Sequence, residues 1–304
     1  MALGLLAPFL LFGVLKLAAK IQYWRWDRLH VSAWEPVKAA LAAENPPPWV
    51  GTYSEPGYHG AETVLHLSTA GFYCGYGRPR FDPPGFGWGP EVEGPWGTLE
   101  LLALDRLAFQ VAWRGDFLGI FVKRPGPIRT LHLIPWEDRV YAVSEEKMLE
   151  FINAVNSQLE LDGRHYPLGY AFKGEAGSVR NPPKPRSPPL LPEKWRNHLL
   201  TRPIEARVLA VGRVQYRKRP YGAERFVPIK ISAGSKQGLK AGHLLHIANF
   251  DRATPVNNFT VGEETSTGEA GEGQEWNPLE TERLPRVGQA VTSRAQYEDE
   301  WAEK

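Results

Sequence analysis

The residues in this chain best suited to chemistry are its eight histidines and its single cysteine. Metal binding requires side chains that converge on one point, so histidine pairs at helix or strand spacing are the informative ones. His243 and His246 are three residues apart, which places them on opposite faces of the strand expected there and disfavours a shared metal. His66 and His132 each stand between two leucines, on the strand face opposite those leucines. They would form a site, completed by a carboxylate, only if their two strands faced each other.

Cys74 is the only cysteine, so the chain has no internal disulfide framework and no zinc site built on several thiolates. No neighbouring histidine or helix start activates its thiol, and a small buried strand residue is the expected role. The glycine-rich stretch 85–89 lacks the lysine and the strand-to-helix setting of a phosphate-binding loop. We therefore predict no catalytic, metal or cofactor-binding residue, and we do not expect an enzyme.

Aromatic side chains gather in the turns of residues 49–163 and are the main candidates for contact with a partner or ligand. Exposed rings stack on sugars, hold an apolar ligand or dock a protein, whereas buried rings fill a small β core. The sequence leaves both uses open. The candidate contact residues are Tyr58, Phe86, Trp88, Trp96, Trp113 and Trp136.

Residues 1–28 have the pattern of a membrane anchor followed by an interface belt. Residues 1–15 carry no charged side chain, and a helix through residue 19 would be about 28 Å long, close to the ~30 Å hydrocarbon core. Because the cations follow the apolar run, the positive-inside rule favours a cytoplasmic body, with a monotopic amphipathic helix as the alternative to a single pass. The interface residues are predicted to be Lys16, Lys20, Tyr23, Trp24, Arg25, Trp26 and Arg28.

The formal net charge of +2 conceals a basic middle, residues 164–240, and an acidic end, residues 251–304. A predicted basic patch borders an expected hairpin turn at residues 220–222. Such a patch faces anionic lipid, or it is screened by the acidic segment 263–275 of the same chain. No nucleic-acid-binding motif accompanies it, so nucleic acid is not expected as a partner. The patch comprises Arg213, Arg217, Lys218, Arg219 and Arg225.

The abundance of glycine and proline excludes a helical bundle and predicts a mainly β chain after the N-terminal membrane helix. Residues 29–48 are expected to form a spacer helix stopped by prolines. Residues 49–163 are expected to form an antiparallel sheet or barrel closed by one helix, which Ser144 would cap. A basic proline-rich linker, 164–203, leads to a small β-barrel, 204–294, with an acidic loop at 260–277, and to an acidic tail, 295–304. The expected strands are 49–53, 63–68, 71–76, 98–103, 106–113, 117–123, 129–134, 139–143, 204–215, 225–232, 243–248 and 289–293.

Two resemblances rest on short motifs. Segments 49–53, 139–141, 151–156 and 203–206 resemble a group of uncharacterised bacterial envelope proteins with a β-rich first domain, which implies no activity. The stretch Gly234–His243 is similar to the glycine-punctuated turn of small barrels in envelope assembly proteins, with Gly238-Leu239 before Gly242. Members of the first group tend to be exported. That resemblance implies an exported body, against the charge rule, so both orientations stay open.

These features predict a non-catalytic, membrane-anchored accessory or scaffold subunit of a membrane protein assembly. Its location would be the cell membrane, and its partners would be the membrane and an integral membrane protein. The alternative is a carbohydrate-binding or small apolar ligand-binding module of the cell envelope, which the turn aromatics favour. No cofactor is expected.

Overall fold

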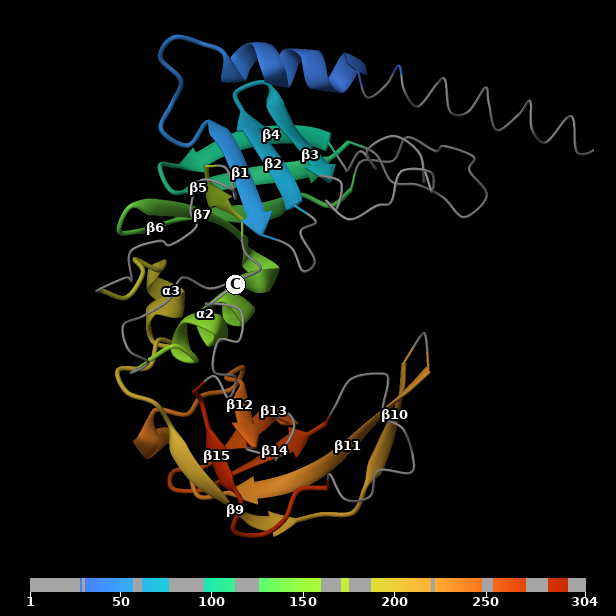
Figure 1. The fold of residues 1–304 in the computed structure, drawn as a ribbon, viewed down its shortest axis with the longest axis vertical. Helices are drawn as coiled ribbons and strands as arrows, with labels where there is room; N and C mark the ends of the chain where they lie inside the picture. Colours follow the sequence, from blue (N-terminus) through green and yellow to red (C-terminus); the bar gives the residue numbers. More distant parts are fainter. Residues whose placement is uncertain are drawn as a thin grey trace, which may run out of the picture. The chain divides into compact units, whose positions relative to one another are not determined.

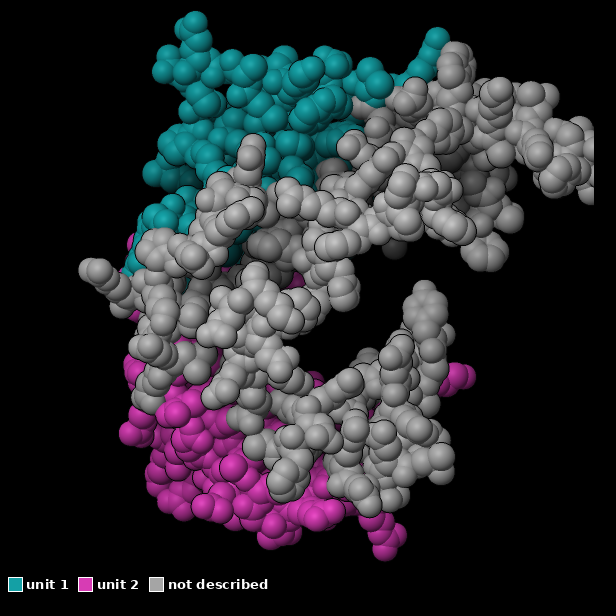
Figure 2. All heavy atoms as spheres, viewed as in Figure 1, with its two compact units in different colours: residues 1–145, 168–181 teal, residues 146–167, 182–304 magenta. Residues whose placement is uncertain are grey.

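The computed structural model describes residues 28, 31–56, 62–76, 96–112, 126–159, 171–174, 187–219, 222–247, 254–271 and 284–294. The chain divides into two compact units, residues 1–145 with 168–181 and residues 146–167 with 182–304 (Figure 2). Each contains a closed antiparallel β-barrel, and helices are few among the described residues (Figure 1). The prediction of a mainly β fold is therefore confirmed.

The first unit is a closed barrel whose strands pair in chain order. The two-residue strand β8 closes it by pairing with both β7 and β1, through Phe172 opposite Tyr141 and Ser54. The predicted strand 117–123 lies outside the described residues. The strands are β1 (Gly51–Pro56), β2 (Glu62–Ser68), β3 (Gly71–Tyr76), β4 (Trp96–Ala103), β5 (Arg106–Val111), β6 (Arg129–Trp136), β7 (Arg139–Ser144) and β8 (Phe172–Lys173).

Alternation along these strands fills the barrel interior with side chains. On β2, Leu65 and Leu67 belong to or pack against the core, while His66 between them faces outward to the ring of Trp34. Residues 31–41 form the predicted helix, which lays Trp34 on the barrel and buries Val37. The core cluster comprises Trp49, Val50, Tyr53, Leu67, Phe72, Leu107, Leu131, Leu133 and Ala142.

The second unit holds a smaller barrel that closes through the pairing of β11 with β9. The order around it is β11, β14, β13, β12, β15 and β9, and β10 pairs with β11 outside this ring. The strands are β9 (Glu205–Val211), β10 (Gln215–Arg219), β11 (Gly222–Ile231), β12 (Leu245–Ile247), β13 (Thr254–Val261), β14 (Ser266–Ala270) and β15 (Ala290–Thr292).

The predicted acidic loop at 260–277 is wrong in its central part, because residues 266–270 form barrel strand β14 between β11 and β13. The strand was missed because its inward positions, Ser266, Gly268 and Ala270, are small and carry no apolar signal. Their size has a packing reason: a Cβ on Gly268 would lie 2.6 Å from the ring of Phe259, which occupies the space.

Strand β11 is twice as long as β10 and β14 and belongs to two structures. Residues 227–231 pair with β14 inside the barrel, whereas residues 222–226 pair with β10. We call residues 215–219 and 222–226 the β10–β11 arm. Figure 1 shows this two-stranded ribbon extending away from the barrel wall.

Helix α2 (Met148–Asn156) groups with the second unit, not with the first domain that the sequence predicted it would close. It follows a 3₁₀ turn, η2 (Glu145–Lys147), and Lys147 occupies the N-cap position without a side-chain cap hydrogen bond, so Ser144 does not cap it. Part of the predicted linker also packs on this unit: residues 187–203 include α3 (Glu193–Arg196) and the buried Leu191.

No helix within the described residues has both the length and the apolar character of a membrane span. The predicted anchor and belt, residues 1–28, lie outside the described residues except for Arg28, an exposed helical residue. The acidic tail 295–304 lies outside them as well.

Two glycines of the second barrel separate the cost of backbone strain from the cost of a clash. Gly288 has φ +89°, and a Cβ at this position would meet open space, so Gly288→Ala should cost about 1 kcal/mol of unfolding free energy from strain alone. Gly234 is the N-cap of the 3₁₀ turn η4 (Ser235–Gln237), where a Cβ would lie 2.6 Å from the backbone of Glu263. Gly234→Ala should cost more, about 2–3 kcal/mol, because backbone must move. Urea denaturation of both variants gives the comparison, and equal costs would contradict the packing argument.

Candidate functional site

The two histidines predicted as a possible pair in the first unit have different partners. His66 Nδ1 lies 3.0 Å from Thr52 Oγ1, and its ring lies 4.7 Å from that of Trp34. His132 is 3% exposed, with Nε2 3.6 Å from a carboxylate oxygen of Glu145. Burial lowers the pKa of His66, which favours the neutral ring. The structure therefore does not unite the pair in one site, and His66 helps to seat the helix of residues 31–41.

Cys74 packs against the core of the first barrel, as the sequence predicted. Burial raises the pKa of its thiol to about 12. The thiolate, the reactive form, is therefore not populated at neutral pH.

Of the aromatic contact candidates, two are described, and they have opposite roles. Trp136 is 1% exposed and lies 6.1 Å, ring to ring, from Tyr141, so it is a core residue and not a contact residue. Trp96 is half-buried and lines a pocket of about 330 Å³ between the helix of residues 31–41 and the start of β4. Phe72, Ala33 and other mostly apolar groups complete that lining. Tyr58, Phe86, Trp88 and Trp113 lie outside the described residues.

The predicted basic patch divides into paired and exposed cations. Arg217 donates to Glu269 on β14 at 2.7 Å, and its guanidinium lies 4.7 Å from the ring centroid of Phe226. Lys218 and Arg213 are exposed, whereas Arg225 is half-buried. The side chain of Arg219 lies outside the described residues. Glu269 lies within the acidic segment 263–275 that the sequence offered as a screen for this patch, but it belongs to strand β14 and not to a loop.

A second aromatic feature accompanies the exposed cations of the arm. Tyr216 is 70% exposed and lies two residues from Lys218, so both project from the same face of β10. The arm thus presents an aromatic ring and an ammonium group side by side. Exposed aromatic rings of this kind are enriched in protein contact surfaces.

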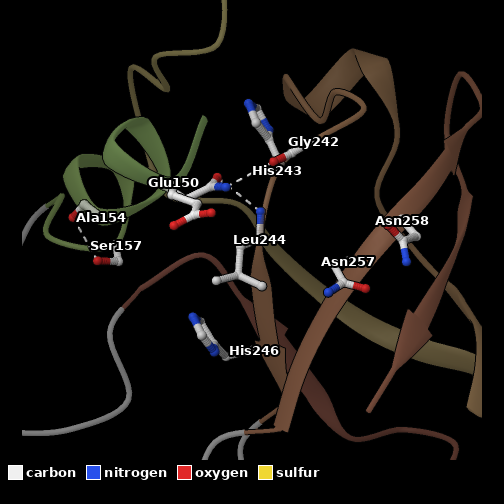
Figure 3. A pocket seen from close by; sticks show the side chains of 10 residues that line it. Glu150, Ala154, Ser157, Gly242, His243, Leu244, His246, Asn257 and Asn258 are labelled. Carbon is white, nitrogen blue, oxygen red and sulfur yellow. Dashed lines mark hydrogen bonds between the residues drawn. The ribbon is translucent and has the colours of Figure 1, made fainter. Parts of the chain in front are cut away.

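The second unit has a pocket of about 490 Å³ between α2 and the strands β12 and β13 (Figure 3). One wall comes from α2 and the residues just after it, at the spacing of one helix face. The other comes from the outer face of the barrel. The lining residues are Glu150, Asn153, Ala154, Ser157, Gly242, His243, Leu244, His246, Asn257 and Asn258.

Asn153 holds α2 to the barrel at one end of this pocket. Its Nδ2 donates to the carbonyl of Gly242 at 2.9 Å, and its Oδ1 accepts from the N–H of Leu244 at 3.0 Å (Figure 3). The side-chain amide thus supplies the two hydrogen bonds that a neighbouring strand would otherwise form with these backbone groups. A Cβ on Gly242 would lie 2.7 Å from Leu149, so glycine permits this close approach of α2.

His243 joins the barrel to the segment 187–203, whose His198 carbonyl also accepts from Asn156 of α2. Its Nε2 lies 3.0 Å from the carbonyl oxygen of His198, and the N–H of Lys240 donates to its Nδ1 at 3.3 Å. The proton therefore sits on Nε2. Burial lowers the pKa of His243 to about 4; the hydrogen bond with the His198 backbone opposes this shift, and the charges of His198 and Lys240 add to it.

His246 differs from His243 because one of its ring nitrogens forms no hydrogen bond with the described residues. Leu245 and Ile247 point into the barrel, so His246 faces outward into the pocket. Its Nδ1 is buried and has no hydrogen-bond partner among the described residues. Burial lowers its pKa, which favours the neutral ring. Within the described residues no cluster of histidine, cysteine and acidic side chains suits a metal ion.

A β-bulge shapes the far wall of the pocket. The register between β13 and β14 shifts between Asn257 and Thr260, and Asn258 has the left-handed φ of +52°. Its Nδ2 donates to Glu269 at 2.6 Å, so the bulge is tied to the carboxylate that also holds Arg217. Bulges re-aim side chains and are frequent beside functional sites. The sequence marks this site with two adjacent asparagines, Asn257 and Asn258, but they were not among the predicted site residues.

No family model matches this chain, and no curated protein or solved structure matches it either.

The depressed pKa of His243 predicts a pH-dependent stability. His243 takes up a proton near pH 6.5 in the unfolded chain but only near pH 4 in the folded protein. The unfolded state therefore binds more protons between these values, and stability should fall as the pH falls from 6.5. The expected loss between pH 6.5 and 5 is about 2 kcal/mol. Urea denaturation at a series of pH values measures it. His243→Gln, which keeps a donor for His198 but does not titrate, should make the curve shallower. His66, His198 and His246, whose pKa values burial also lowers, should keep some pH dependence. An unchanged curve would refute the assignment.

Proposed function

We propose that this protein is a non-catalytic accessory or scaffold subunit of a membrane assembly, and that it contacts its partner through the β10–β11 arm. The observation that carries the proposal is the arm itself, a ribbon that leaves the barrel with Tyr216 and Lys218 on one face. Anchoring through residues 1–28 at the cell membrane belongs to the proposal. The proposal covers both orientations of the protein, with its body on the cytoplasmic side or exported.

The construction of the arm supports a role in contact rather than in folding. A two-stranded ribbon by itself is only marginally stable in water. Here β11 runs on from the barrel, and Arg217 joins the arm to Glu269 while stacking on Phe226. These contacts hold the ribbon without covering Tyr216. A partner would therefore meet a preformed surface, which lowers the entropic cost of association.

Charge indicates what kind of partner suits the arm. Lys218 and the nearby Arg213 are exposed, and no acidic side chain is paired with Lys218 among the described contacts. An acidic surface of an integral membrane protein complements them, and charge complementarity raises association rates and specificity. Anionic lipid headgroups would meet the same cations without using Tyr216.

Partner recovery in mild detergent tests the proposed role of the arm. The full-length protein with Tyr216→Ala and Lys218→Ser should recover its partner at least about tenfold less well, since interface tyrosines are frequent hot spots. Val287→Ala removes an equally exposed apolar side chain outside the arm and should leave recovery unchanged. Recovery of the wild type only as a lone monomer would contradict the accessory role, and equal recovery of both variants would contradict the use of the arm.

A second candidate function is the binding of a carbohydrate or small apolar molecule in the first unit. The pocket that Trp96 lines favours it, because apolar groups of Phe72, Ala33 and Val37 surround the indole. Aromatic and aliphatic linings of this kind suit an apolar ligand better than a charged one.

Tryptophan fluorescence distinguishes this candidate from the accessory role. Titration with a medium-chain fatty alcohol should quench the emission saturably if the pocket binds apolar molecules. Ala33→Leu fills the pocket while keeping Trp96 and should weaken the binding at least about tenfold. Quenching that is linear in the alcohol concentration, or that survives Ala33→Leu, would reject the ligand-binding function.

A further inference from the structure

The pocket between α2 and β12 contains polar groups that the fold does not use. The side chains of Asn153 and His243 already form hydrogen bonds with backbone groups of the second unit, so they hold the fold together. His246 presents a buried Nδ1 without a hydrogen-bond partner among the described residues, and Asn257 is an exposed carboxamide on the neighbouring strand (Figure 3). Nδ1 is too buried for a ligand to reach, so the groups that a ligand in the pocket would meet are the edge of the His246 ring that lines it and the carboxamide of Asn257.

The charges around the pocket select an uncharged ligand. Among the described lining residues Glu150 is the only charged side chain, because burial favours the neutral form of the two histidines. Both of its carboxylate oxygens accept from Lys147, at 2.8 and 2.7 Å. A charged ligand would therefore lose its hydration without gaining a free counter-charge.

The remaining lining indicates a ligand with both hydroxyl and C–H surfaces. Leu244 and Ala154 provide apolar contact, and the Ser157 hydroxyl, which donates to the Ala154 carbonyl at 2.8 Å, keeps oxygen lone pairs as acceptors. The volume of about 490 Å³ lies within the range of small-molecule sites. Neutral sugars combine hydroxyl groups with an apolar ring face, and match this lining.

We propose that this pocket binds a neutral polyhydroxylated molecule, a sugar of one or two rings, with His246 and Asn257 as its hydrogen-bonding residues. The two walls are already in place for it. Asn153 holds α2 to the strand, and Glu269 holds the bulge at Asn258. A preformed site of this kind lowers the ordering cost of binding. The site is separate from the β10–β11 arm and from the pocket of Trp96, so it does not depend on either proposed function.

Saturation-transfer NMR on the full-length protein tests the proposal with three probes: methyl glucoside, maltose and glucuronate. A neutral sugar should bind saturably, with a Kd in the range of about 1 mM, and glucuronate should bind at least about tenfold more weakly. His246→Ala and Asn257→Ala should each raise the Kd about five- to tenfold through the loss of a hydrogen bond. Asn257 is exposed, so its variant keeps the test valid if His246→Ala does not fold.

Two matched controls locate the binding. Val287→Ala changes an exposed side chain elsewhere on the second unit, and Ala33→Leu fills the pocket of the first unit. Both should leave the Kd unchanged. The proposal is overturned if neither neutral sugar gives a saturable response, if glucuronate binds as tightly as the neutral sugars, or if Ala33→Leu but not Asn257→Ala weakens the binding.

Discussion

The hydrogen bonds between two asparagines of α2 and the backbone of the second unit determine how this chain is organised. Asn153 pairs with Gly242 and Leu244, and Asn156 pairs in the same way with the carbonyl of His198 and the N–H of Leu200. Each carboxamide satisfies one backbone acceptor and one backbone donor outside the barrel ladders. The helix therefore groups with the second unit although its sequence directly follows the last long strand of the first. The pocket at His246 exists because the helix lies there.

Both barrels close their hydrogen-bonding edges and fill their interiors, which leaves their outer faces for recognition. In the first barrel the interior includes Tyr53 and Phe72; in the second it includes Phe259 and Ile229. Barrels of this size have interiors that side chains can fill. The features with unused chemistry are accordingly external: the arm at Tyr216 and the pocket at His246. Their residues differ, although Glu269 holds both Arg217 of the arm and Asn258 of the pocket wall.

Sequence reasoning recovered most of the first barrel but only part of the second. Strands such as 71–76 alternate regularly, and the expected and observed bounds agree. Strand β13 escaped because the bulge at Asn257 breaks the alternation, putting its buried residues Val256 and Phe259 three positions apart. Strand β14 escaped because its inward residues are small. Of the site, the sequence singled out His243 and His246 and dismissed them as a metal pair. It did not foresee that His243 would bind a backbone carbonyl while Nδ1 of His246 has no hydrogen-bond partner among the described residues.

What the sequence determined by itself is what depends on local pattern: the β-rich class, the turns at Gly238 and Gly242, both with left-handed φ of +87°, and the packing of Cys74 against the barrel core. Each follows from alternation or from the backbone freedom of one residue. The tertiary structure alone decided the assignment of α2, which acidic residue of the segment 263–275 pairs with Arg217, and the burial of Trp136 as opposed to the half-exposure of Trp96. These depend on groups far apart in the chain, and no local pattern encodes which distant donor, acceptor or ring will face them.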